Sequence, residues 1–282
     1  MARLISGARH IVREALDDNL TGEAAKLAYY AFLSIFPAVL VLFALTGLLG
    51  GERAFDWIMG RLGTTLPPEA ASYLGRYVRD VTAQARPDIL SAGLLLLLWS
   101  SSNVFAALAD GLNTMYDLGE ERSWWKKRLV AVAFLLGSVV FLVAAVAVIL
   151  AGGPIGEALG LDAIWDVLGI VVAFLLLATI LWAAYTVLPN RKEKAARLPT
   201  FVGAVVGALL WAVATLGFRF YVSNFGSYSV TYGAVGAAIV LMLWLYLSGV
   251  AILFGGEVAS VLERRRKGRG DTTRGEALRR AA

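Results

Sequence analysis

Six long apolar blocks dominate the pattern of hydrophobic and polar positions along this chain. They cover residues 27–50, 89–109, 129–151, 164–188, 201–223 and 233–256. A transmembrane α-helix needs about 20 consecutive, mainly apolar residues to cross the hydrocarbon core of a bilayer. The pattern therefore predicts an all-α polytopic membrane protein with six transmembrane helices, in which residues 1–262 form a single membrane domain.

Shorter amphipathic segments lie outside the six blocks. Residues 4–16 place their apolar side chains on one helical face and their arginines off it. This predicts an N-terminal helix that either lies on the membrane surface or packs against the spans. The 51–88 loop carries two further apolar stripes, at 55–62 and 70–81. They predict a helical external cap between the first and second spans.

Charge sets the expected orientation in the membrane. Twenty of the 26 Lys and Arg residues lie in segments 1–26, 110–128 and 189–200 or after Glu257. By the positive-inside rule, these segments and both termini are cytoplasmic and the 51–88 loop is external. Residues 263–282 then form a basic cytoplasmic tail, either a disordered end or a segment drawn to anionic headgroups. Orientation explains the basic residues without nucleic acid as a partner.

The composition agrees with a membrane protein and narrows the chemistry. Hydrophobic residues make up 59% and charged residues 17% of the chain, whereas soluble domains carry about 25% charged residues. No cysteine is present, which excludes disulfides, thiol catalysis and iron–sulfur clusters. The single histidine, His10, suits a solvated helix face. We expect no metal or other cofactor.

Polar positions inside the predicted spans mark a candidate substrate pathway. Pro37 interrupts the first span and frees the carbonyl of Leu33, which Ser34 or a neighbouring span would satisfy. The serines and the asparagine in mid-span 2 are either interhelical contacts or the lining of a polar cavity. An arginine and two tyrosines mark the outer rim. The candidate pathway residues are Pro37, Ser100, Ser101, Asn103, Arg219, Tyr228 and Tyr232.

Four charges stand at the predicted membrane boundaries. Lys26, Asp110 and Glu257 lie near the cytoplasmic boundary and Asp166 near the outer one. Asp166 is the expected ionic partner of Arg219, which could instead hold an anionic ligand. Small residues at 233, 236 and 237 open the sixth span and predict close helix packing there.

Several motifs resemble the YihY/BrkB family of bacterial inner-membrane proteins. They are AAKLAYY at 24–30 with SIFP at 34–37, ADGLNTMY at 109–116, SYSVTYGAVG at 227–236, WLY at 244–246 and GGE at 255–257. The resemblance covers residues 20–262 and implies six spans in the plasma membrane. It implies little chemistry, because the activity of the family is not settled, although some members carry a ribonuclease label.

Two classes of function fit this sequence. No charge lies at mid-membrane, where ion-coupled carriers usually place one. We therefore expect a transporter or flippase-like protein that handles a lipid or an anionic amphiphile, with membrane lipids as partners. A structural or scaffolding membrane protein without transport is the alternative. A ribonuclease is disfavoured because Asp117, Glu120 and Glu121 lie beside basic residues, and we expect no enzymatic activity.

The topology predicts the labelling of single cysteines added to this Cys-free chain. A cysteine at Arg61 should react with a membrane-impermeant maleimide only from outside the cell, and one at Ser123 only from the cytoplasm. Reaction of the residue 61 cysteine only from the cytoplasm would reverse the assignment.

Overall fold

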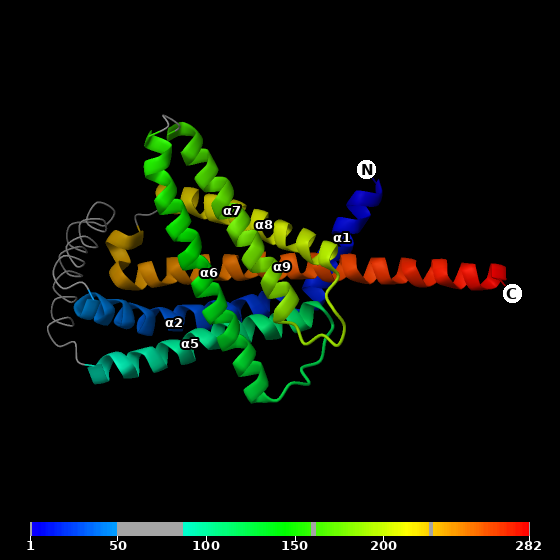
Figure 1. Cartoon of the computed structure of the whole chain (residues 1–282), viewed down its shortest axis with the longest axis horizontal. Coiled ribbons are helices and arrows are strands. Elements are labelled where there is room, and N and C mark those ends of the chain that lie inside the picture. Colours follow the sequence, from blue (N-terminus) through cyan, green and yellow to red (C-terminus); the bar gives the residue numbers. More distant parts are fainter. Residues whose placement is uncertain (1, 50–86, 159–161, 226–227, 282) are drawn as a thin grey trace. The chain divides into compact units, whose positions relative to one another are not determined.

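The computed structural model describes residues 2–49, 87–158, 162–225 and 228–281, and within them every regular element is an α-helix. The helices are α1 (Ala2–Asp17), α2 (Leu20–Leu49), α5 (Pro87–Met115), α6 (Trp124–Ala158), α7 (Asp162–Val187), α8 (Arg197–Phe225) and α9 (Tyr228–Ala281) (Figure 1). The all-α prediction is confirmed for this part of the chain. The cap predicted within 51–88 falls almost wholly outside the described residues.

Each predicted apolar block lies within one helix, to within one residue at the block's ends, and most of the helices extend several residues beyond their blocks. Three helical segments of the described chain are long and apolar enough to cross a membrane, namely Ser91–Met115, Arg197–Val222 and Ala238–Lys267. A shorter apolar stretch covers Val171–Val187. Long uninterrupted helices are the expected form for such sequences, because backbone groups in hydrocarbon must be paired within their own segment. Six crossings remain a prediction.

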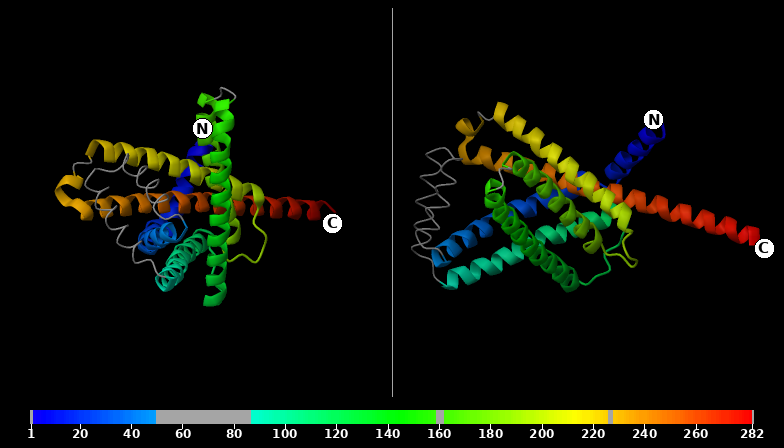
Figure 2. Two further views of the ribbon diagram at one scale, coloured as in Figure 1. Left: turned by 60° about the vertical axis from the view of Figure 1, so that its left-hand side comes forward. Right: turned by 45° about the horizontal axis from the view of Figure 1, so that its top comes forward.

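The chain divides into two compact units. Unit 2 is Tyr30–Asn103, and unit 1 combines Met1–Tyr29 with Val104–Ala282. Helices α2 and α5 each contribute residues to both units. In unit 1, α8 packs along α9, α7 against α8, α6 against α7, and α1 against α9. Both views of Figure 2 show α8 and α9 side by side.

Three glycines allow α8 and α9 to approach at backbone distance. A Cβ atom added to Gly255 would lie 2.6 Å from the hydroxyl oxygen of Tyr185 and 2.7 Å from the carbonyl oxygen of Gly203. Gly207 borders the same contact. Small residues at helix interfaces permit this approach. The sequence predicted close helix packing at a different place, the start of α9, where Gly236 is buried.

Helices lie at both ends of the described chain. Helix α1 packs against α9 and buries Ala15, while Val12 and Leu16 stay exposed. This matches packing against the spans, one of the two alternatives for the N-terminal helix. At the other end, α9 continues to Ala281, and the role of the basic tail stays a prediction. Val258 and Val261 are buried in this continuation, which keeps it helical past the predicted boundary at 256.

Replacing Gly255 by alanine should destabilise the protein, because the new methyl group has no room between α8 and α9. We expect a loss of about 1–3 kcal/mol in the free energy of unfolding, as for other overpacked sites. Chemical denaturation in detergent, followed by circular dichroism, measures it.

Gly217 on α8 is the matched control, since a Cβ there meets nothing within 4 Å. Gly217→Ala should be neutral or stabilise the helix by up to about 1 kcal/mol. Equal effects of the two changes would contradict the close contact at Gly255.

Candidate functional site

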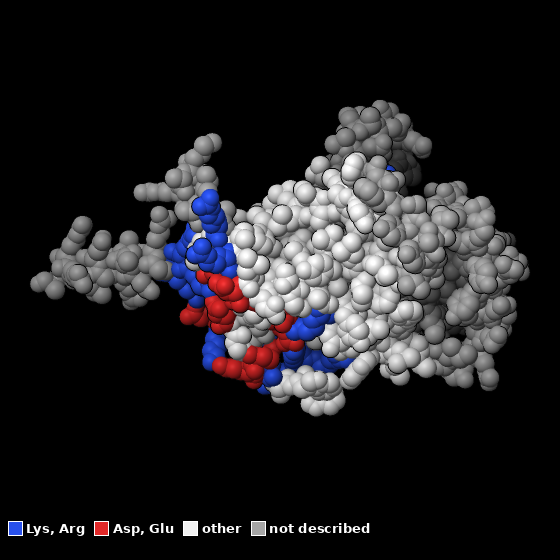
Figure 3. Space-filling model, turned by 180° about the vertical axis from the view of Figure 1, so that it is seen from behind, with Lys and Arg blue, Asp and Glu red and all other residues white. Residues whose placement is uncertain are grey.

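Charged side chains from four separate segments of unit 1 meet in one cluster, here called the charged face. The segments are residues 10–26, 110–127, 191–193 and 257–267, and ion pairs join them. Figure 3 shows Lys, Arg, Asp and Glu gathered in one band beside a surface without these residues. These are the segments that the charge pattern predicts to share the cytoplasmic side.

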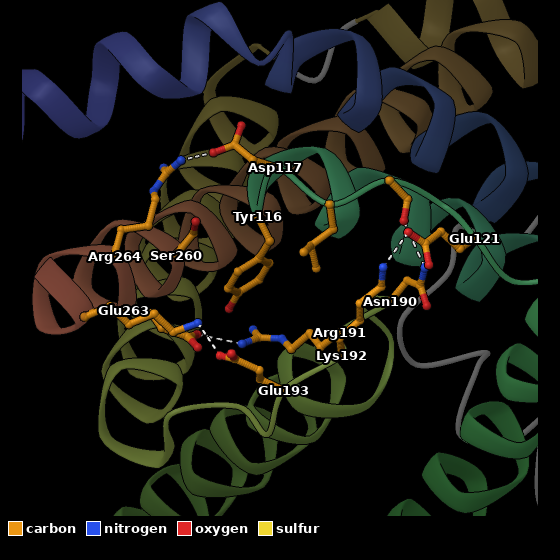
Figure 4. Close-up of a pocket in the computed structure, with 13 residues that line it drawn as sticks. Tyr116, Asp117, Glu121, Asn190, Arg191, Lys192, Glu193, Ser260, Glu263 and Arg264 are labelled. Carbon is orange, nitrogen blue, oxygen red and sulfur yellow. Dashed lines mark hydrogen bonds and ion pairs between the residues drawn. The ribbon is translucent and has the colours of Figure 1, made fainter. Parts of the chain in front are cut away.

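The charged face contains a cavity of about 380 Å³ between α9, the end of α5 and the 190–193 segment (Figure 4). Arg191 is its central residue. Its Nη1 lies 2.6 Å from Oε2 of Glu263, and the two side chains are only 10% and 11% exposed. Nη2 of Arg191 donates to the Tyr185 carbonyl at 3.1 Å. The guanidinium stacks 4.0 Å from the ring centroid of Tyr116, which adds a cation–π attraction.

Two asparagines connect the loops around this cavity. Oδ1 of Asn113 accepts from the Asn190 backbone N–H at 2.7 Å, and its Nδ2 donates to Glu120 at 3.0 Å. Nδ2 of Asn190 donates to the Gly119 carbonyl at 2.9 Å. Asn113 is 3% exposed, so these bonds satisfy a buried amide. Hydrogen bonds from Arg122 lower the pKa of Glu120 below its usual value.

Arg264 is a second centre of the charged face. Its guanidinium pairs with Asp117, with Glu14 at 3.0 Å and with Glu257 at 3.3 Å. Figure 4 shows the Asp117–Arg264 contact at the edge of the cavity, with Tyr116 directed into the cavity itself. Glu257 is 0% exposed. Arg264 therefore joins α1, the segment after α5 and α9.

A second cavity, here called the apolar groove, lies between α6 and α7 and has a volume of about 440 Å³. Its lining is Val130, Ala133, Phe134, Gly137, Ser138, Phe141, Thr179, Ile180, Ala183 and Val187. Only Ser138 and Thr179 carry polar side-chain atoms, and the Thr179 hydroxyl already donates to the Leu175 carbonyl at 2.7 Å. A Cβ added to Gly137 would meet nothing within 4 Å. The groove is thus an open hydrophobic surface.

Polar and aromatic side chains stand at one end of the apolar groove. Lys126 lies one turn before Val130 and shares its helix face, since residues 126, 130, 134, 137 and 141 recur at intervals of three or four. Lys126 is exposed and forms no ion pair with any described residue. Trp124 and Trp125 are exposed beside it, with ring centroids 4.4 Å apart.

The predicted pathway residues of unit 2 bond mainly to their own helices. Ser100 donates to the Leu97 carbonyl at 3.2 Å, and the neighbouring Ser102 to that of Trp99 at 2.8 Å. Ser101 and Asn103 are half-buried. Such bonds satisfy serine hydroxyls without another helix. Hydrogen bonds within α5 therefore satisfy the hydroxyls of Ser100 and Ser102.

Pro37 lies inside α2, as expected. The Ser34 hydroxyl donates to the carbonyl of Ala31 at 2.7 Å. Ser34 therefore does not satisfy the Leu33 carbonyl that Pro37 leaves free, because its hydroxyl reaches back three residues along the helix.

The outer-rim candidates belong to unit 1. Arg219 is exposed on α8. The side chains of Asp166, Tyr228 and Tyr232 fall outside the described part of the chain, so the expected Arg219–Asp166 pair stays a prediction. The candidate pathway residues are divided between the two units, and the pathway stays a prediction.

The predicted cytoplasmic boundary charges and the acids weighed for a nuclease lie on the charged face. Lys26 pairs with Glu23, Asp110 with Lys127, and Glu257 with Arg264. The three acids after α5 are each paired with a base, as Asp117–Arg264, Glu120–Arg122 and Glu121–Lys192. Among the described residues, no three acidic or histidine side chains are grouped to hold a metal ion.

Sequence reasoning missed Arg191, Glu263, Asn113 and Lys126 as site residues. Asn113 falls within the 109–116 motif, which was its one available signal. Arg191 and Lys126 were counted only as topology charges. Their specific partners depend on which helix ends meet, and a single sequence does not state this.

Comparison with known proteins identifies one family for this chain. Residues 11–279 match the family model described as virulence factor BrkB. The ribonuclease-like protein YfkH of Bacillus subtilis is 33% identical over 87% of this chain and 90% of its own length. A UPF0761 membrane protein of Pseudoalteromonas atlantica is 27% identical over 90% of this chain and 85% of its own. No solved structure matches the chain.

Replacing Glu263 by glutamine should destabilise the protein strongly, because it leaves the buried Arg191 guanidinium without its counter-charge. Breaking a buried pair in this way costs about 3–5 kcal/mol. Denaturation in detergent measures the loss.

Glu121→Gln is the control, since the Lys192–Glu121 pair is 79% and 64% exposed and such pairs contribute about 0–1 kcal/mol. Equal losses in the two variants would show that the Arg191–Glu263 pair is solvated rather than buried.

Proposed function

We propose, from the premise that this chain belongs to the virulence factor BrkB family of membrane proteins, that it handles an anionic amphiphilic lipid as a transporter or flippase-like protein. The observation that carries the proposal is the apolar groove between α6 and α7 with Lys126 at its end. The groove would hold an acyl chain and the lysine an anionic headgroup.

The lining of the groove suits a hydrocarbon chain. Its volume of about 440 Å³ lies within the range of ligand pockets, about 300–1,000 Å³. Phe134, Phe141 and Ile180 supply apolar walls, and no charged residue lines the groove. An empty groove in a bilayer would leave these side chains without contacts, whereas an acyl chain restores them.

The end of the groove suits an anionic headgroup. Lys126 has no described acidic partner, so its charge is available to a phosphate. A lysine near an anionic membrane surface contributes about 1 kcal/mol to lipid attraction. Trp124 and Trp125 are exposed at the same level, as is typical of side chains at the headgroup boundary. The combination favours a phospholipid over a neutral apolar ligand.

The orientation in the membrane completes this proposal. Both termini and the charged face would lie in the cytoplasm of a bacterium, with six spans in the inner membrane. The ion pairs that join residues 10–26, 110–127, 191–193 and 257–267 support one shared side for these segments. The lipid would then enter the groove from the inner leaflet. Asn103 and Arg219 remain candidate contacts along the rest of its path.

A structural or scaffolding role is the second candidate, and the charged face favours it. Its bases and acids are largely paired with one another, and the basic end of α9 extends beyond them. Such a surface could recruit an acidic partner without any transport. The word ribonuclease belongs to the name of YfkH, and the paired acids after α5 provide no support for that chemistry here.

Filling the groove should stop lipid movement. Gly137→Leu places a side chain in open groove space, so folding should be unaffected. In vesicles with purified protein, the transfer of fluorescent phosphatidylglycerol between leaflets should fall at least tenfold. Dithionite quenching of the outer leaflet measures this transfer.

Gly217→Leu is the matched control, because Gly217 is equally open but lies on α8 outside the groove. Its transfer rate should equal that of the unmodified protein. Lys126→Gln should slow phosphatidylglycerol more than phosphatidylcholine. No protein-dependent transfer in the unmodified protein would refute transport and leave the scaffolding role.

A further inference from the structure

The carboxylate of Glu257 stands in an unusual place on the charged face. It is 0% exposed, and its Oε1 receives only the 3.3 Å contact from Arg264. Its Oε2 is buried and has no hydrogen-bond donor within the described structure. A buried ionised carboxylate without partners is costly, since desolvation disfavours its charged form.

Asp18, at the junction of α1 and α2, interacts with Glu257. Burial and the charge of Asp117 raise the pKa of Asp18, and a side-chain hydrogen bond with Glu257 opposes that rise. Two ionised carboxylates have no hydrogen between them, because each is only an acceptor. The contact is attractive only when one group carries a proton, as in other carboxyl pairs.

The surroundings contain more acid than base. Arg264 is shared by Glu14, Asp117 and Glu257, and Asp18 adds a fourth carboxyl group. One guanidinium therefore faces four carboxyl groups, an imbalance that a bound proton reduces. Burial and the charge of Asp117 raise the pKa of Asp18 above its usual value.

The other ionisable groups nearby already have partners or are uncharged. Glu23 pairs with Lys26 at 2.5 Å and Glu263 with Arg191 at 2.6 Å. Burial raises the pKa of Tyr116, so its ring stays neutral. On α1, His10 lies 3.6 Å from Glu14 and would compete with Arg264 for it when protonated. None of these groups supplies a second cation to Glu257. A metal ion is not indicated, because no described group of acids is placed to hold one.

We propose that Glu257 and Asp18 form a proton-binding site in which one hydrogen is shared between their carboxyl groups at neutral pH. The proton comes from cytoplasmic water and joins an oxygen of Glu257, which then donates to Asp18. Release leaves two facing carboxylates and returns the proton to water. No other bond changes.

Proton release should loosen α1 from α9. The hydrogen bond from protonated Glu257 to Asp18 is present at low pH and is lost as the pH rises and Glu257 releases its proton. Four carboxylates then repel one another around Arg264. In terms of the proposed function, on which this step rests, the cytoplasmic pH would regulate lipid movement.

Infrared spectroscopy of the full chain in nanodiscs tests the site. The protonated carboxyl group has a C=O band distinct from that of carboxylates. We expect this band at neutral pH, its loss in Glu257→Gln, and a shift of its frequency in Asp18→Asn. Glu193→Gln is the control, because Glu193 is an exposed acid paired with Lys267, and it should leave the band unchanged.

The outcomes separate the site from the proposed function. Absence of the band in the unmodified protein, or a band unchanged in both Glu257→Gln and Asp18→Asn, would overturn the proton site. If Glu257→Gln does not fold, the frequency shift in Asp18→Asn decides. A band with these responses but no lipid transfer in vesicles supports the site and refutes transport. Lipid transfer that is equal at low and high pH on the side of the charged face refutes the regulation alone.

Discussion

Backbone contact between α8 and α9 determines where the charged groups of this protein stand. At Gly203 and Gly255 no side chain fits between the two helices. The fully buried Tyr185 lies beside this contact and donates its hydroxyl hydrogen to the Ile252 carbonyl. Because the glycines bring α9 this close, residues about half a turn and about two turns later have defined neighbours. Glu257 reaches the α1–α2 junction, and Glu263 reaches Arg191.

The separation of charge from apolar surface follows from the same arrangement. Helices α6 to α9 expose many large apolar side chains, including Val140, Leu175, Val213 and Ile239, which a bilayer would cover. A charge on that surface would lose its hydration without compensation. The bases and acids instead meet where the helix ends converge, and they neutralise one another there. Among the described residues, Lys126 is an exception, because it is exposed and has no acidic partner. This is why we propose it as a ligand contact.

The sequence predicts the helices of this fold well, and their contacts poorly. Apolar blocks of sufficient length identify α2, α5, α6, α7, α8 and α9, because length and hydropathy are properties of one segment. The contact at Gly203 and Gly255 depends on two segments together. The sequence around either glycine does not indicate which helix it will contact. The same holds for Arg191 and Glu263, which are 72 residues apart. Local competition also matters, since Ser100 and Ser102 bond to their own helix.

The end of α5 and the residues that follow it lie between the groove and the proton site. Asp110 pairs with Lys127 of α6, next to Lys126, and Asp117 pairs with Arg264 beside Glu257. A change in the number of carboxylates around Arg264 would alter its ion pair with Asp117. The chain between Asp117 and Asp110 would transmit that change. If lipid occupancy shifts α6, the effect on the proton must be reciprocal, because coupling between two binding sites has one free energy. If both proposals hold, the segment from Asp110 to Asp117 is the one that both sites share.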